Sequence, residues 1–152
     1  MVKDIRKKIE VHKKQVEIEL LDKLSLTEDL SSFFRGEIKK QSNKNNNFLI
    51  VSCSKSSTNE VNLEATEYLN LIAGGIDNKH LCFVGEEKKI LDDILNDQKK
   101  NFNIIIHPIF YFDGFLYKKN LKDLNKLNNV KYLKPISHYP QVLNLISKRL
   151  GL

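Results

Sequence analysis

The sequence predicts a three-layer α/β protein whose central sheet is mostly parallel. Apolar runs of strand length alternate with segments of helical periodicity, which is the pattern of repeated βαβ units. One run, Ile104–Ile106, is continuously apolar, as expected of a strand covered on both faces. Crossover connections between such strands are right-handed, and ligands of parallel sheets bind beyond the carboxyl ends of the strands.

The N-terminal 40 residues are predicted to form a helix–strand–helix segment. Helical spacing of apolar residues predicts a helix over 2–13, and alternation predicts a strand over Val16–Leu20. Ser25–Glu28 has the form of a capping box that opens a second helix. The apolar face of that helix consists of Leu30, Phe33, Phe34 and Ile38. The polar, asparagine-rich residues 41–47 are predicted to be a linker to a domain over 48–152.

Four apolar runs of strand length follow the linker, and helices are predicted between them. The runs are Phe48–Cys53, His80–Val84, Ile104–Phe110 and Val130–Ile136. The first helix begins at a second capping box, Ser57–Glu60, and ends at Gly74 and Gly75. Its apolar stripe is Val61, Ala65, Tyr68, Leu69 and Ile72. Shorter stripes near Ile90, Leu121 and Val142 predict three more helices.

Composition limits the partners and the compartment. The net charge of +6 favours anionic partners, but basic residues are not interleaved with aromatic ones and Trp is absent, so we expect no nucleic-acid partner. No apolar run approaches the roughly 20 residues that span a bilayer, so we expect no membrane partner. The charged N-terminus has no signal-peptide core, which predicts a cytoplasmic protein, or a plastid stromal one if organelle-encoded. Cys53 and Cys82 lie in separate apolar runs and are predicted to be buried free thiols.

Three segments, in order, resemble the sirohydrochlorin chelatases of the CbiX type. Cys53–Ser57 is similar to the turn after the first strand in the second half of the long, two-half members. Ile104–Lys118 is similar to their strand-Pro-x-Phe-Leu-x-x-Gly-x-Leu-x-x-Lys segment, and Ile136–Pro140 to their Leu-Gly-x-His-Pro. The resemblance implies a chelatase-like (flavodoxin-like) fold. It also implies a role in siroheme or cobalamin synthesis, with Co²⁺ or Fe²⁺ as the substrate metal and no organic cofactor.

The resemblance also explains an internal similarity. The first 40 residues resemble the last 35, and Val2–Ile5 resembles the segment that follows the second catalytic His of a first half. Residues 1–40 therefore resemble the tail of a first half, and 48–152 a whole second half.

The catalytic pattern of the family is not matched. There, two histidines and a glutamate at three strand ends handle the metal and the protons. Their positions fall on Ser54, on Gly85 with Glu86 next to it, and on Leu116. If active, the protein is a chelatase, a lyase; otherwise it is a non-catalytic half that needs a separate first-half polypeptide or a homo-oligomer.

Other residues are candidates for binding a sirohydrochlorin-type tetrapyrrole, which is a polycarboxylate. The substrate candidates are Ser54, Lys55, Ser56, Ser57, Gly114 and Lys118. The metal candidates are His107 and His138. Each has a structural alternative: serines often cap helices, lysines often form a solvated face, and a histidine in a strand is often part of the core.

Two further functions stay open. One is a non-enzymatic partner or a binding module for an anionic tetrapyrrole, and an exposed apolar patch would favour the partner version. The other is a flavodoxin-like signalling or nucleotide domain. Neither a GxGxxG nor a GxxxxGK[ST] motif occurs in the sequence, which weighs against the nucleotide alternative.

Overall fold

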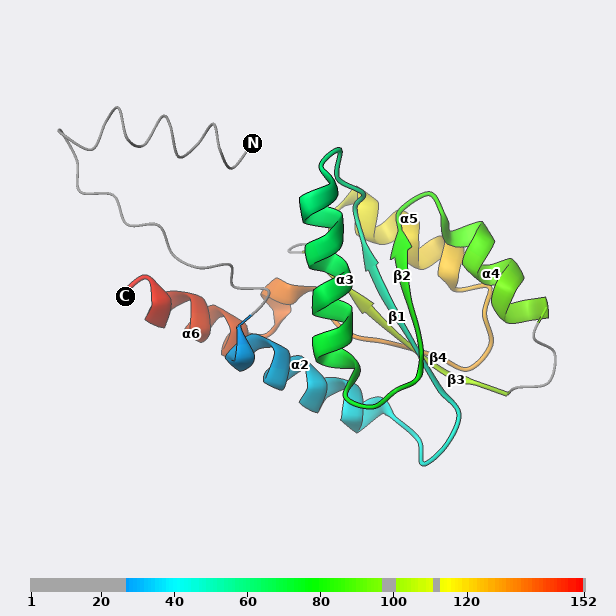
Figure 1. Ribbon diagram of the computed structural model, residues 1–152, viewed down its shortest axis with the longest axis horizontal. Helices are drawn as coiled ribbons and strands as arrows, with labels where there is room; N and C mark the ends of the chain where they lie inside the picture. The colour runs from blue at the N-terminus through cyan, green and yellow to red at the C-terminus, as the bar shows by residue number, and fades with distance from the viewer. Residues whose placement is uncertain (1–26, 97–100, 111–112, 152) are drawn as a thin grey trace.

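The described part of the chain contains one parallel sheet. The computed structural model describes residues 27–96, 101–110 and 113–151, with backbone alone for 95 and 96. Its strands are β1 (Asn47–Cys53), β2 (Asn78–Phe83), β3 (Asn103–Pro108) and β4 (Val130–Tyr132). They are ordered β2-β1-β3-β4, so β1 and β3 are central and the other two are edges (Figure 1). All pairs are parallel, with Ile50 of β1 aligned with Ile106 of β3, which confirms the predicted fold class.

Helices cover both faces of the sheet. They are α2 (Glu28–Gln41), α3 (Asn59–Ala73), α4 (Glu87–Asn96), α5 (Phe115–Leu124) and α6 (Pro140–Arg149). The helices α2, α3 and α6 pack on one face, and α4 and α5 pack on the other (Figure 1). The result is the three-layer arrangement that the alternating pattern predicts.

Each face has its own core. On the first face, Val51 and Ile105 from the strands pack with Phe34, Ile72 and Val142 from the three helices, and all five are fully buried. On the second, the core consists of Ile50, Cys82, Ile90, Leu91, Phe102, Ile104, Ile106, Leu124 and Leu127. Burial of each large aliphatic side chain stabilises the fold by about 1.5–3 kcal/mol. The helix α2, which precedes the polar residues 41–47, thus shares the core of the segment that follows.

Several local predictions are confirmed. The residues of β3 are all buried, as the continuous apolar run predicts. Gly74 ends α3 in a left-handed conformation with φ of 55°, which glycine adopts without steric cost. Cys53 and Cys82 are buried free thiols.

Two predictions are wrong in detail. The N-cap of α3 is Thr58, which makes no side-chain cap hydrogen bond, so the capping box predicted at Ser57–Glu60 does not form. The last strand ends at Tyr132, because Pro135 lacks an N–H and the chain then turns into a short 3₁₀ helix, η2 (Ile136–His138). The helix and strand predicted before residue 21, and the start of the capping box at Ser25, lie outside the described residues and stay predictions.

Helix length and hydropathy decide whether a helix could cross a membrane. Within residues that the structure describes, every helix is too short or too polar to cross a bilayer.

Candidate functional site

The carboxyl ends of β1, β2 and β3 meet at one edge of the sheet, called here the carboxyl edge. Ser54–Thr58 follow β1, Val84–Glu86 follow β2, and Ile109 and Phe110 follow β3. Helices α3, α4 and α5 begin at this edge, because each crossover returns the chain from the end of one strand. Most of the candidate substrate residues therefore lie in loops at one end of the molecule.

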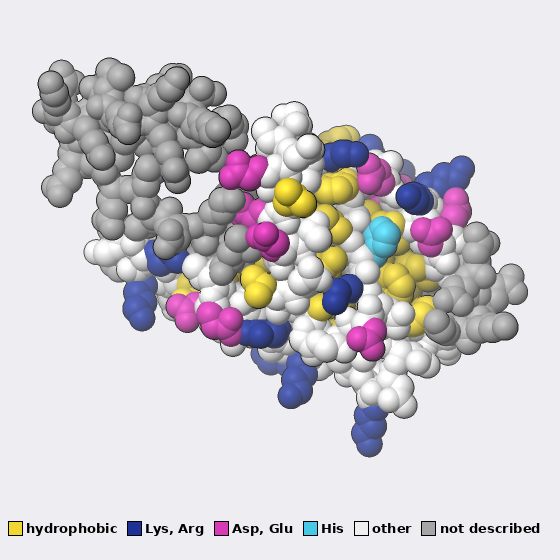
Figure 2. Space-filling view, viewed as in Figure 1, with side chains coloured by type: hydrophobic (Ala, Val, Ile, Leu, Met, Phe, Trp, Pro, Cys, Tyr) yellow, Lys and Arg dark blue, Asp and Glu magenta, His cyan; other side chains and the backbone are white. Residues whose placement is uncertain are grey.

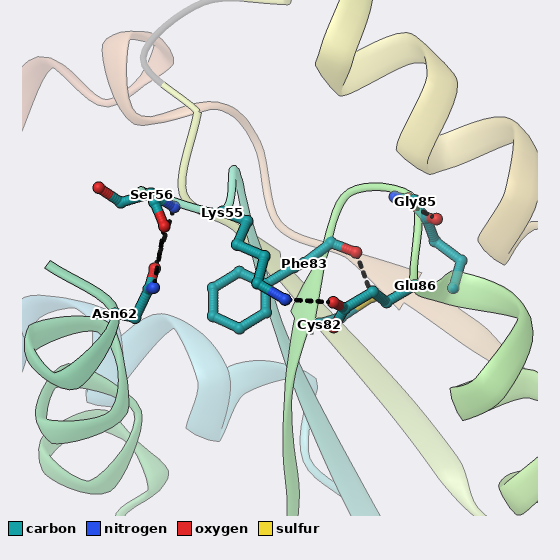
Figure 3. A network of polar contacts seen from close by, with 8 residues as sticks. Lys55, Ser56, Asn62, Cys82, Phe83, Gly85 and Glu86 are labelled. Carbon is teal, nitrogen blue, oxygen red and sulfur yellow. Dashed lines mark hydrogen bonds and ion pairs between the residues drawn. The ribbon is translucent and has the colours of Figure 1, made fainter. Parts of the chain in front are cut away.

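The loop after β1 is held to α3 by Ser56 and Asn62 (Figure 3). The Ser56 N–H donates to Asn62 Oδ1, and Asn62 Nδ2 donates to the Ser56 carbonyl, both at 3.0 Å. The Ser56 hydroxyl also accepts the Thr58 N–H at 3.2 Å, which takes the role that sequence reasoning gave to a capping box. Ser56 is therefore engaged in shaping the loop, whereas Ser54 and Ser57 are exposed and free to meet a ligand.

Lys55 connects the loops after β1 and β2. Its ammonium lies 2.8 Å from Glu86 Oε1 and 5.6 Å from the centre of the Phe83 ring (Figure 3). Both side chains of the ion pair are about half exposed, 61% for Lys55 and 47% for Glu86. A pair so exposed is worth at most about 1 kcal/mol, so either charge can be exchanged for that of a ligand.

The loop after β2 is held by a residue that sequence reasoning missed, Glu87. Glu87 Oε2 accepts the Gly85 N–H at 2.7 Å, and Oε1 accepts from Asn120 Nδ2 of α5 at 3.1 Å. Both side chains are buried. Gly85 has φ of 98°, a left-handed conformation that strains other residues. A signal was present in the sequence, since an acidic residue within two positions of a turn glycine often begins a helix.

The residues at the start of α5 lie on the surface. Gly114 is the N-cap of the helix, and its carbonyl accepts the Lys118 N–H at 3.1 Å. Leu116, at the second histidine position of the family pattern, is 44% exposed, and Lys118 is also exposed.

The two candidate metal ligands lie in different surroundings. His107 is fully buried in β3, with Nε2 2.9 Å from the Tyr68 hydroxyl and the ring against Phe34. Burial lowers the pKa of His107 from 6.5 to about 3, so the imidazole is neutral at physiological pH. His138 is exposed in η2. Over the described ranges, no group of three or more His, Cys, Asp and Glu side chains could hold a metal ion.

An apolar cavity of about 270 Å³ opens beside the loop after β1. It is lined by Leu30, Cys53, Ser54, Val61, Asn62, Glu64, Ala65, Tyr68, Ile109, Ile136 and Ile146. Burial raises the pKa of the Cys53 thiol to about 11, so it is not a thiolate at neutral pH. The cavity therefore suits an apolar group better than a carboxylate or a metal ion.

Comparison with known proteins agrees with this arrangement. The family model described as CbiX matches residues 50–151, which include every strand end described above. No curated protein and no solved structure matches the chain. The match covers most of the chain, and it includes the strand–turn–helix segments whose motifs carried the resemblance. The chain belongs to the CbiX family of sirohydrochlorin chelatases.

Proposed function

We propose that this chain is a non-catalytic half of a sirohydrochlorin chelatase, which helps to bind the tetrapyrrole while a separate catalytic half inserts the metal. The observation that carries the proposal is the set of side chains at the three family positions. Ser54, Gly85 and Leu116 supply neither an imidazole nor a carboxylate. Family membership itself gives a chelatase-like role in tetrapyrrole biosynthesis, with a divalent metal as substrate.

The chemistry of insertion explains why those positions matter. Two pyrrole N–H protons must leave, and the metal must be held and delivered. The Glu87 carboxylate lies at Gly85 but is buried and engaged by the Gly85 N–H and by Asn120. The exposed carboxylate next to Gly85 is Glu86, and Lys55 already neutralises it at 2.8 Å. An ammonium at that distance also repels a divalent cation, which disfavours Glu86 as a metal ligand.

Exposed apolar side chains at the carboxyl edge support the need for a partner. Val61 and Leu63 in the first turns of α3 are 41% and 63% exposed, and Phe115 and Leu116 at the start of α5 are 79% and 44% exposed. Apolar side chains clustered at one end of a domain, beside an apolar cavity, are typical of an interaction surface. A catalytic half seated here would cover them and would bring its own histidines to the macrocycle.

The remaining candidates would bind the carboxylates at the periphery of the tetrapyrrole. Lys55 and Lys118 provide positive charge at the carboxyl edge, and Ser54, Ser57 and the Gly114 backbone provide hydrogen-bonding groups. Ser56 positions the others through Asn62. We place the macrocycle over the carboxyl edge, and we leave His107 and His138 as residues without a metal-binding role.

The experiment is a titration of the purified chain with sirohydrochlorin, followed by absorbance. Lys118→Met should weaken binding several-fold, because it removes a charge at the carboxyl edge. Lys126→Met is the matched control, since Lys126 is also exposed but lies past the opposite end of α5. No binding by the wild-type chain, or equal effects of the two variants, would contradict the proposed binding face.

A further inference from the structure

The buried carboxylate of Glu87 joins the loop after β2 to α5. Its Oε2 accepts the Gly85 N–H at 2.7 Å, and its Oε1 accepts from Asn120 Nδ2 at 3.1 Å. Glu87 is 3% exposed and Asn120 is 0% exposed, so these hydrogen bonds are shielded from water. Helix α4 begins at Glu87 and packs against α5 (Figure 1). One side chain therefore connects the loop after β2, the start of α4 and the middle of α5.

Each end of this connection lies close to a lysine of the proposed binding face. In the loop after β2, Glu86 is the residue next to Glu87, and it accepts from the Lys55 ammonium at 2.8 Å (Figure 3). In α5, Lys118 lies two residues before Asn120. A change at Glu87 therefore affects the place of Lys118 relative to Lys55.

The amino end of α5 is otherwise weakly packed. Phe115 and Leu116 are 79% and 44% exposed. The Tyr117 side chain is only half-buried, and its ring centre lies 6.2 Å from that of Phe110. Asn120 is the first buried residue of the helix, and its amide donates to the Glu87 carboxylate. This hydrogen bond therefore helps to set where the amino end of α5 lies relative to the loop after β2.

We propose that Glu87 and Asn120 are positioning residues for tetrapyrrole binding, which hold Lys118 at a fixed place relative to Lys55. The inference rests on the proposed function, because it takes both lysines as contacts of one polycarboxylate ligand. The carboxylates of a macrocycle are carried on one frame. Two lysines therefore bind them together most tightly when the separation of the lysines is set before the ligand arrives.

The Asn120 amide allows the role of Glu87 to be tested with a conservative variant. Its Oδ1 is buried and has no hydrogen-bond partner in the part of the chain that the structure describes. In Glu87→Gln, the new Oε1 would accept the Gly85 N–H, and the new Nε2 would donate to Asn120 Oδ1 once the asparagine amide turns over. This variant keeps the reach of Glu87 without its charge. Glu87→Asp keeps the charge but is one methylene shorter, so it does not span from Gly85 to Asn120.

The experiment is a double-mutant cycle on the full chain, measured by titration with sirohydrochlorin. Lys118→Met should weaken binding several-fold in the wild type and in Glu87→Gln. In Glu87→Asp it should weaken binding by less than about twofold, because Lys118 is no longer held in place. Asp92→Ala is the matched control: Asp92 is an exposed acidic residue of α4, and its replacement should leave the effect of Lys118→Met unchanged.

The two Glu87 variants separate position from charge. Basic and acidic side chains lie together on the surface where Figure 1 places α4 and α5 (Figure 2), so loss of one negative charge there could by itself tighten the binding of an anion. If charge were the role of Glu87, Glu87→Gln would differ from the wild type and Glu87→Asp would not. That result overturns the proposal.

Hydrogen exchange tests the same role without a ligand. The Lys118 N–H donates to the Gly114 carbonyl at 3.1 Å in the first turn of α5, and it should exchange several-fold faster in Glu87→Asp than in Glu87→Gln. Equal exchange in the two variants overturns the proposal. An equal effect of Lys118→Met in both Glu87 variants also overturns it but leaves the proposed function in place. Absence of sirohydrochlorin binding by the wild-type chain contradicts the proposed function and this inference together.

Discussion

Replacing His107 with glutamine should remove much of the acid sensitivity of the fold. The His107 side chain is fully buried, with Nε2 2.9 Å from the Tyr68 hydroxyl and its ring centre 4.3 Å from that of Phe34. Glutamine keeps a hydrogen-bonding group for Tyr68 but does not titrate. The replacement also changes how a buried side chain of this size packs, and that effect does not depend on pH. The pH dependence of the free energy of unfolding therefore isolates the titration of His107.

The sign and the magnitude follow from the two pKa values of His107. Burial holds the folded-state pKa near 3, against 6.5 for an exposed imidazole, so below pH 6.5 the unfolded chain binds the proton and the folded chain does not. The stability contributed by the neutral imidazole is thus complete above pH 6.5 and is lost as the pH falls toward 3. Between pH 6.5 and pH 5 the loss is about 2 kcal/mol, at about 1.36 kcal/mol per pH unit.

The assay is urea unfolding of the wild type and of His107→Gln at pH 7 and pH 5. We expect the free energy of unfolding of the wild type to fall by about 2 kcal/mol more than that of the variant between the two pH values. His138→Gln is the control, because His138 is exposed and its replacement should leave the wild-type pH dependence in place. Equal pH dependence in the wild type and His107→Gln would refute the reasoning.

Three further predictions concern the loops at the carboxyl edge. Asn62→Ala breaks both hydrogen bonds to Ser56 and should cost about 1–2 kcal/mol by urea unfolding, whereas the exposed Asn70→Ala should be neutral. Glu87→Ala leaves the Gly85 N–H and the buried Asn120 amide without their acceptor and should cost about 2–4 kcal/mol, with Glu86→Ala the milder control. Lys55→Met should change the free energy of unfolding by less than about 1 kcal/mol yet weaken sirohydrochlorin binding; unchanged binding would remove Lys55 from the proposed site.

The burial of elements with strong local patterns was predicted correctly from the sequence. The unbroken apolar run of β3 predicts a doubly covered strand, and β3 is buried throughout. The stripe of α2 predicts that Leu30, Phe34 and Ile38 face a core, and all three are buried. These predictions hold because periodicity reports directly which side chains must leave water.

Contacts between distant segments could not be predicted. Glu87 and Asn120 are 33 residues apart, and Tyr68 and His107 are 39 apart, so no local spacing indicates either pair. The capping box predicted at Ser57–Glu60 failed for a related reason: the Ser56 hydroxyl, one position before this box, accepts the Thr58 N–H. A motif that describes one helix end cannot account for hydroxyls that a neighbouring loop supplies.

The most direct measurement is the rate of metal insertion by the chain alone. Purified protein is mixed with sirohydrochlorin and Co²⁺ or Fe²⁺, and the absorbance change is compared with the spontaneous rate in protein-free buffer. A non-catalytic half should bind the tetrapyrrole and leave the insertion rate at the spontaneous value. Insertion clearly faster than the spontaneous rate would contradict the account, because it would mean that the chain catalyses insertion without an imidazole or a carboxylate at the three family positions.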